Sequence, residues 1–112
     1  MKYLLLFTLL LGGCAANKPS IPRWLHDKLL QAERNPGSYE EVWQYEYRGQ
    51  VVYYFLPGCC DRFTELYAAD GRLVCRPAGG ITGNGDGKCR KFLTGRKNGE
   101  LIWKPQGSQI DS

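Results

Sequence analysis

Residues 40–57 read EEVWQYEYRGQVVYYFLP, and this stretch decides the fold. Trp43, Tyr45 and Tyr47 alternate with largely polar residues, and a period of two is typical of a half-buried strand. Residues 51–56 are apolar at every position, which predicts a central strand covered on both faces. Between the two runs, Gly49-Gln50 fits a two-residue type II′ turn with glycine first, so the sequence predicts an antiparallel hairpin.

The predicted turn fixes the register of this hairpin, because each residue then has one partner across the ladder. The expected pairs are Arg48 with Val51, Tyr45 with Tyr54, and Trp43 with Leu56. The aromatic side chains gather on one face in this register, and we expect a helix to pack on that face. The alternative is that the aromatic ladder is a platform for a ligand.

A helix is predicted before the hairpin and three more strands after it. Residues 22–35 (PRWLHDKLLQAERN) carry apolar side chains at helical spacing and end at the breakers Pro36 and Gly37. Residues 63–67 and 72–75 flank an Asp-Gly turn signal, and residues 100–104 follow a predicted turn around Asn98-Gly99. The order predicts an α+β fold with one N-terminal helix packed on a curled antiparallel sheet of four to five strands.

The first twenty residues, MKYLLLFTLLLGGCAANKPS, predict export. Lys2 precedes the apolar residues 3–11, a run about half as long as the roughly 20 residues that span a bilayer. The sequence LGGC at residues 11–14 resembles the bacterial lipobox, in which the chain is cut before a cysteine that is then acylated. We expect a lipoprotein signal peptide over residues 1–13, a lipidated Cys14, a tether over 14–20 and a single domain over 21–112.

These expectations give the protein a location and a first partner. Several acyl chains on one residue hold a protein firmly in a lipid bilayer, because each buried methylene contributes about 0.8 kcal/mol. Residues 15–18 (AANK) contain no acidic residue that would resemble a surface-export or inner-membrane retention signal. We therefore expect a protein anchored to the bacterial outer membrane and facing the periplasm. An ordinary secretory signal peptide is the alternative.

The chain has five cysteines, and lipid on Cys14 leaves four in an oxidising compartment. A bond between Cys59 and Cys60 would be strained, because disulfides hold their Cα atoms about 5.5–6 Å apart. Neighbouring residues in an extended chain point to opposite faces. We therefore predict that one of these two bonds to Cys75 and the other to Cys89, in either combination. A zinc site or a redox-active pair is less well supported, since the sequence lacks CxxC spacing and a nearby histidine.

Charge and composition narrow the choice of partner and chemistry. The full chain has 15 basic and 11 acidic residues, and its only adjacent basic pairs are Arg90-Lys91 and Arg96-Lys97. Such scattered charge indicates a solvated surface, so we expect no nucleic-acid partner. The single histidine, His26, lies off the apolar side of the predicted helix, next to Asp27. No other residues complete a catalytic set with it, so we expect neither an enzyme nor a cofactor.

Residues 77–90, PAGGITGNGDGKCR, form a long loop with five glycines, and loops of this kind are usually functional or mobile. Neither a P-loop nor a dinucleotide-binding fingerprint fits it. An EF-hand loop that starts at Thr82 fits in part, because its third and fifth positions are Asn84 and Asp86, whereas its first and twelfth positions lack acids. Asn84 and Asp86, with Asp61, are weak candidates for calcium ligands. We prefer a plain glycine-rich turn with no metal.

The motifs from Tyr45 to Cys89, with the later ELIWK, resemble a family of small bacterial envelope lipoproteins catalogued as a domain of unknown function. The shared patterns are Y-x-Y-x-G-x-x-V-Y-Y, then C-C-D, then G-G-x-T-G-x-G-D-G-x-C. The chain departs from the family at Ala78, where aspartate is more usual, and this weakens any metal site there. The resemblance implies an envelope lipoprotein and brings no established activity.

The sequence therefore favours a non-enzymatic binding or structural module of the cell envelope, with an envelope protein or glycan as its partner. One alternative is a protease inhibitor that presents a disulfide-braced loop, because residues 50–52 (QVV) resemble the start of the cystatin motif QxVxG. That motif ends in glycine, which Tyr54 replaces in this chain. The other alternative is weak calcium binding through the glycine-rich loop.

Overall fold

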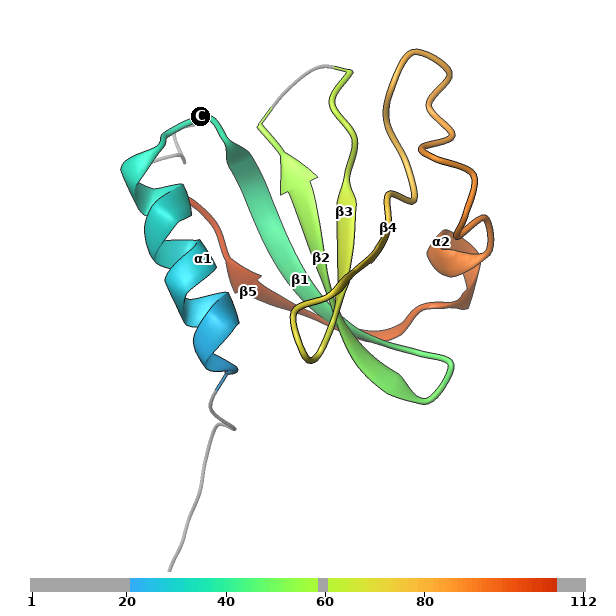
Figure 1. Cartoon of the computed structure of the whole chain (residues 1–112), viewed down its shortest axis with the longest axis horizontal. Helices are drawn as coiled ribbons and strands as arrows, with labels where there is room; N and C mark the ends of the chain where they lie inside the picture. The colour runs from blue at the N-terminus through green and yellow to red at the C-terminus, as the bar shows by residue number, and fades with distance from the viewer. Residues whose placement is uncertain (1–20, 59–60, 107–112) are drawn as a thin grey trace, which may run out of the picture.

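The computed structural model describes residues 21–58 and 61–106 of the chain. The elements in chain order are α1 (Arg23–Arg34), β1 (Tyr39–Tyr47), β2 (Gln50–Pro57), β3 (Glu65–Ala68), β4 (Leu73–Cys75), α2 (Phe92–Gly95) and β5 (Lys97–Trp103). The five strands form one antiparallel sheet in the order β4-β3-β2-β1-β5 (Figure 1). The predicted helix and antiparallel sheet are confirmed, and the four-residue α2 was not predicted.

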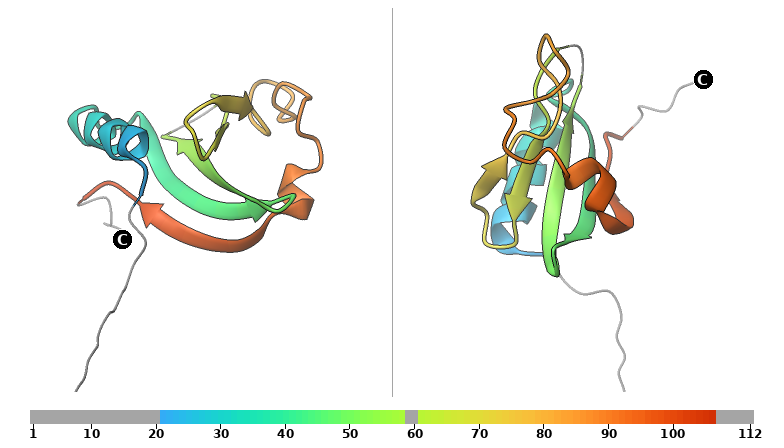
Figure 2. Two further views of the ribbon diagram at one scale, coloured as in Figure 1. Left: turned by 60° about the horizontal axis from the view of Figure 1, so that its bottom comes forward. Right: turned by 90° about the vertical axis from the view of Figure 1, so that its right-hand side faces the viewer.

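Several predictions fall on the rest of the chain. The signal peptide, Cys14 and the tether lie outside the described residues, as do Cys59 and Cys60. Within residues 21–58 and 61–106, no helix has both the length and the apolar character needed to cross a membrane. The sheet curls strongly, and β1 and β5 bend along their length (Figure 2).

The turn between β1 and β2 lies one residue earlier than predicted. Arg48 and Gly49 are its two central residues, and both have positive φ, 55° and 78°, as a type I′ turn requires. The type II′ turn at Gly49-Gln50 is therefore wrong, and so is its register. The observed pairs are Tyr47 with Gln50, Tyr45 with Val52, and Trp43 with Tyr54. Because the register moves by two positions, every side chain keeps its predicted face of the sheet.

The helix packs on the opposite face from the one predicted. Leu25 of α1 is fully buried against Val42, Tyr53 and Phe55, whose side chains lie on the other face from Trp43, Tyr45 and Tyr47. The aromatic face contacts Phe92 of α2 instead, and this side chain is also fully buried. The physical reason is that α2 and the segment before it return to the aromatic face and fill it.

Polar contacts hold α1 against its face of the sheet. The Trp24 Nε1–H donates to the Ala69 carbonyl at 2.8 Å, and the Trp103 Nε1–H donates to Glu33 Oε2 at 2.7 Å. The Lys28 ammonium lies 5.0 Å from the centre of the Tyr67 ring, a cation–π contact. These contacts add to the burial of Leu25, which contributes about 1.5–3 kcal/mol.

The outer strands agree in part with the prediction from the sequence. The hairpin of β3 and β4 turns at Asp70-Gly71 as predicted, and the Ala68 N–H donates to the Arg72 carbonyl at 2.9 Å. The predicted turn at Asn98-Gly99 is wrong, because both residues lie inside β5. They form an irregularity there, with φ 53° at Asn98 and a shift in the pairing with β1. Gly99 is required at this point, since a Cβ would collide with the Tyr45 ring.

Candidate functional site

The candidate site is the loop that leaves the sheet after β4, and a disulfide closes its base. Cys75 bonds to Cys89 with the Cα atoms 6.1 Å apart. The prediction that these two cysteines bond to Cys59 and Cys60 is therefore wrong. Cys75 is buried on the aromatic face and Cys89 packs against the same cluster, so the returning chain brings the two sulfurs together. Closing a loop of about this length contributes about 3 kcal/mol.

Asp86 holds the two sides of the loop together. Its Oδ2 accepts from the Arg76 N–H at 2.9 Å, and its Oδ1 accepts from the Lys88 N–H at 3.0 Å. The Asp86 N–H also donates to the Arg76 carbonyl at 2.9 Å. The Lys88 amide, followed by the Arg76 amide, holds the pKa of the Asp86 carboxyl below its usual range. The ionised carboxylate therefore stabilises the folded loop.

The upper part of the loop rests on residues 61–64. The Thr64 N–H donates to the Ala78 carbonyl at 3.0 Å, and the Ala78 N–H donates to Thr64 Oγ1 at 3.0 Å. Above this pair, the Gly80 N–H donates to the Asp61 carbonyl at 2.7 Å. Gly85 has φ 65°, and a Cβ there would collide with the Arg76 carbonyl. Glycine therefore allows the backbone to pack closely enough for the loop to be well hydrogen-bonded.

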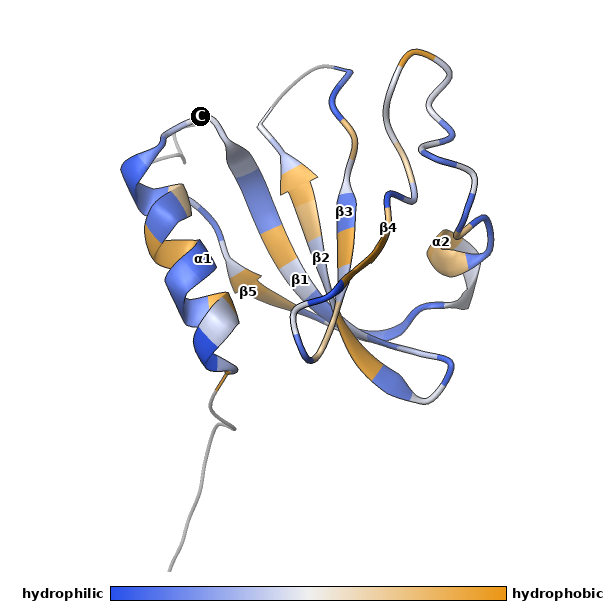
Figure 3. Cartoon of the chain, viewed as in Figure 1, coloured by the Kyte–Doolittle hydropathy of each residue, from blue (hydrophilic) through white to orange (hydrophobic). Residues whose placement is uncertain are grey.

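The tip of the loop is apolar and open to solvent. Ile81 is 95% exposed, and Phe63, whose ring lies under Gly80, is 43% exposed. Figure 3 shows this hydrophobic tip above a mostly polar loop. The tip lies at the opposite end of the molecule from the start of α1 (Figures 1 and 2). Sequence reasoning missed both residues, although each is an isolated apolar side chain in a polar or glycine-rich context (DRFTE and GGITG).

The structure shows a side-chain role for Asp86 and main-chain contacts for the other two weak calcium candidates, Asp61 and Asn84. Asp86 uses both carboxylate oxygens on backbone amides. Asp61 contributes its main-chain carbonyl to the loop, and the Asn84 N–H donates to Thr82 Oγ1 at 3.2 Å. Within residues 21–58 and 61–106, no group of three or more His, Cys, Asp or Glu side chains is placed to hold a metal ion.

His26 lies on the exposed side of α1. Its Nδ1 is 3.8 Å from the Asp27 Oδ1, and both side chains are well exposed to solvent. A contact between two exposed side chains contributes little to stability, because water surrounds both. The histidine belongs to α1 and lies outside the loop and the aromatic core described above.

Three comparisons with known proteins bear on identity. Neither the curated proteins nor the solved structures contain a match to this chain. One family model matches, over residues 28–105, and this range begins inside α1 and ends after β5. It includes the whole of the disulfide-closed loop. The chain therefore belongs to the family described as Domain of unknown function (DUF6970).

Proposed function

We propose that the protein is a non-enzymatic binding module of the bacterial envelope, anchored by lipid on Cys14, and that it presents the tip of the 76–88 loop to a protein partner. The observation that carries this proposal is Ile81, which is 95% exposed on a loop fixed by a disulfide and by Asp86. A single exposed aliphatic residue is ordinary on a protein surface. A braced loop with an apolar tip is a better candidate for recognition.

The energetic argument rests on how well the loop is ordered before it binds. A segment that is already fixed loses little conformational entropy on association, so more of the contact energy remains as affinity. Burying a side chain such as Ile81 in a partner's pocket contributes about 1.5–3 kcal/mol. Phe63 lies beside the tip and widens the apolar contact. A few such residues usually carry most of the energy of an interface.

The position of the loop agrees with a lipid anchor. The proposed lipidated residue precedes α1 by a short tether, and the loop tip lies at the far end of the molecule from the start of α1 (Figure 1). On this arrangement the tip points away from the membrane surface. A partner in the periplasm could then reach Ile81, and we propose an outer-membrane lipoprotein that faces this compartment.

The two alternative functions are less well supported. A protease inhibitor of the substrate-like kind needs an extended segment around the residue that enters the protease. Here Gly79, Gly80 and Gly83 have φ of 98°, 79° and 83°, so the backbone around Ile81 turns tightly. Calcium binding through the loop would have to use the Asp86 carboxylate, each of whose oxygens already accepts a backbone N–H.

The test is site-specific photo-crosslinking from residue 81 in intact envelopes, followed by identification of the crosslinked peptide. The expected result is one predominant partner protein, which Ile81→Asp no longer captures from envelope extract. Leu30→Asp is the matched control, because Leu30 is 44% exposed on α1, away from the loop. If residue 81 crosslinks to nothing, or if both variants capture the same proteins as the native chain, the loop is not the binding surface.

The anchor has a separate test. A mass spectrum of the protein purified from envelopes, recorded with and without reductant, reports the lipid on Cys14 and the number of disulfides together. We expect a chain that begins at an acylated Cys14. An intact leader on a soluble chain would refute the lipoprotein part of the proposal and leave the loop part unaffected.

A further inference from the structure

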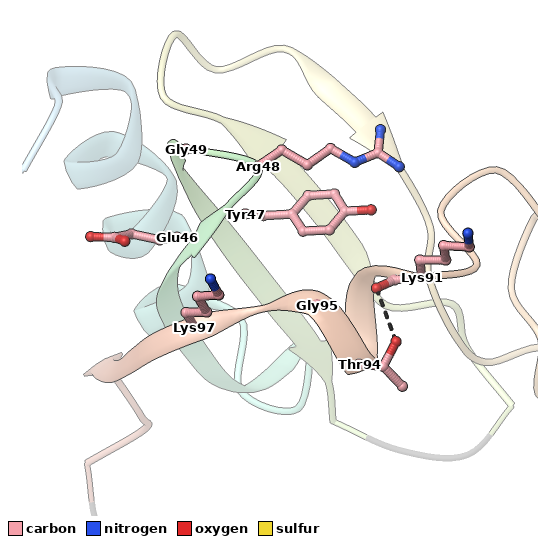
Figure 4. A pocket seen from close by; sticks show the side chains of 8 residues that line it. All are labelled: Glu46, Tyr47, Arg48, Gly49, Lys91, Thr94, Gly95 and Lys97. Carbon is pink, nitrogen blue, oxygen red and sulfur yellow. Dashed lines mark hydrogen bonds between the residues drawn. The ribbon is translucent and has the colours of Figure 1, made fainter.

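A cationic cleft lies beside the turn between β1 and β2, away from the loop tip. It consists of two adjoining hollows of about 480 and 350 Å³ that share Tyr47, Arg48 and Lys91. Figure 4 shows the first hollow, in which Arg48 extends from the hairpin turn and Lys91 from the segment before α2. The basic side chains of the cleft are Arg48, Lys88, Arg90, Lys91 and Lys97.

Basic side chains outnumber carboxylates in the lining of this cleft. The lining has five basic side chains and one carboxylate, that of Glu46, whereas the formal net charge of the whole chain is only +4. Glu46 Oε1 accepts from Asn98 Nδ2 at 3.1 Å, and its carboxylate points away from Tyr47 and Lys91 in Figure 4. Among the described residues, the five basic side chains form no ion pair. An anion in the cleft would therefore be attracted by several basic side chains at once.

The core beneath the cleft holds the Arg48 side chain and the backbone of Lys91 in place. The Arg48 guanidinium lies 5.0 Å from the centre of the Tyr47 ring, and that ring packs edge-to-face on buried Phe92, with 5.2 Å between ring centres. The Lys91 carbonyl accepts from the Gly95 N–H at 2.9 Å, so the backbone of Lys91 is fixed at the start of α2. The Arg48 guanidinium is thus presented to the cleft by packing and not by chance exposure.

We infer that this cleft is a binding site for phosphate groups, with Arg48 as the bidentate donor and Lys91 as the neighbouring cation. A guanidinium matches the paired oxygens of a phosphate, and a lysine ammonium adds a point charge. Because two hollows share Arg48 and Lys91, they suit a ligand with two phosphates better than a ligand with a single carboxylate. The phosphates belong either to lipid headgroups or to a soluble phosphorylated molecule. This site stands independently of the proposed role of the loop.

The experiment uses inorganic pyrophosphate as the probe and the full-length protein in neutral detergent micelles, with binding measured by calorimetry. We expect saturable binding that Arg48→Gln and Lys91→Gln each weaken at least about tenfold, because each change removes one or more charge-assisted hydrogen bonds. Arg48→Lys keeps the positive charge but lacks the paired N–H donors of a guanidinium, so its affinity should lie between those of Arg48→Gln and the native chain. Arg34→Gln removes an exposed cation from α1 and should leave the affinity unchanged.

Three results would overturn the assignment. The first is an absence of saturable pyrophosphate binding. The second is an equal loss of affinity in Arg34→Gln, which would mean a general effect of surface charge. The third is tighter binding of citrate than of pyrophosphate. Competition by vesicles identifies the source of the phosphate and supports the site either way. Displacement of pyrophosphate by phosphatidylglycerol vesicles, but not by phosphatidylcholine vesicles, assigns the site to lipid headgroups. If neither kind of vesicle displaces it, the ligand is a soluble phosphorylated molecule.

Discussion

Phe92 offers the sharpest test of how the aromatic face is closed. Its side chain is fully buried, and its ring lies 4.9 Å from Tyr54, 5.2 Å from Tyr47 and 5.8 Å from Tyr45, between ring centres. Removing a buried phenyl group costs its transfer free energy and leaves a cavity, about 3–5 kcal/mol in all. Small domains unfold with about 5–15 kcal/mol in total, so Phe92→Ala should remove a large part of the stability.

The assay is urea unfolding without reductant, followed by tryptophan fluorescence. Phe92→Ala should lower the free energy of unfolding by about 4 kcal/mol, and Phe92→Leu by less, since it fills part of the cavity. Leu93→Ala is the control, because this neighbour is 42% exposed and its loss should fall within about 0.5 kcal/mol. If Phe92→Ala loses less than about 1 kcal/mol, α2 does not close the core as described.

Two further predictions concern titration and the loop. The Tyr39 and Tyr67 hydroxyls both donate to Glu65 Oε1 at 2.8 Å, and burial, followed by this hydrogen bond, raises the pKa of Tyr67 well above its ordinary value. Unfolded tyrosine ionises near pH 10 while the folded side chain keeps its proton, so the free energy of unfolding should fall as pH rises above about 10. Tyr67→Phe should flatten that fall in urea titrations between pH 9 and pH 11, and an unchanged slope would contradict the linkage. Asp86→Ala frees two backbone amides, so trypsin should cleave after Lys88 faster than in the native chain under non-reducing conditions, and equal rates would show that the carboxylate does not brace the loop.

The hairpin of β1 and β2 shows what the sequence could predict of the fold. An alternation of period two identifies the strands and the residues that share a face, because it follows from backbone geometry alone. It does not say which face meets the helix. Phe92 decides that question, since it fills the aromatic face from a segment with no strong periodicity of its own. The prediction places the turn between β1 and β2 one residue too late for a local reason. Arg48 adopts the left-handed conformation that glycine usually supplies.

The candidate site was less predictable than the fold. The glycine-rich loop could be recognised from composition, but the exposure of Ile81 depends on how Thr64, Ala78 and Gly80 hold the backbone. The pairing of Cys75 with Cys89 depends on the path by which the loop returns, and arguments from neighbouring cysteines cannot supply that path. The cationic cleft is likewise assembled from separate segments, so scattered charges in the sequence become adjacent only in the fold.

The disulfide connects the two proposed surfaces. Cys89 closes the loop that carries Ile81, and it also lines the second hollow of the cationic cleft. Its partner Cys75 ends β4, a three-residue edge strand that has little pairing of its own to fix the chain that follows. The covalent bond therefore fixes the base of the loop and the chain next to Cys89. The oxidised bond braces both surfaces, and this brace agrees with the export that the leader sequence predicts, because a reducing compartment would remove it.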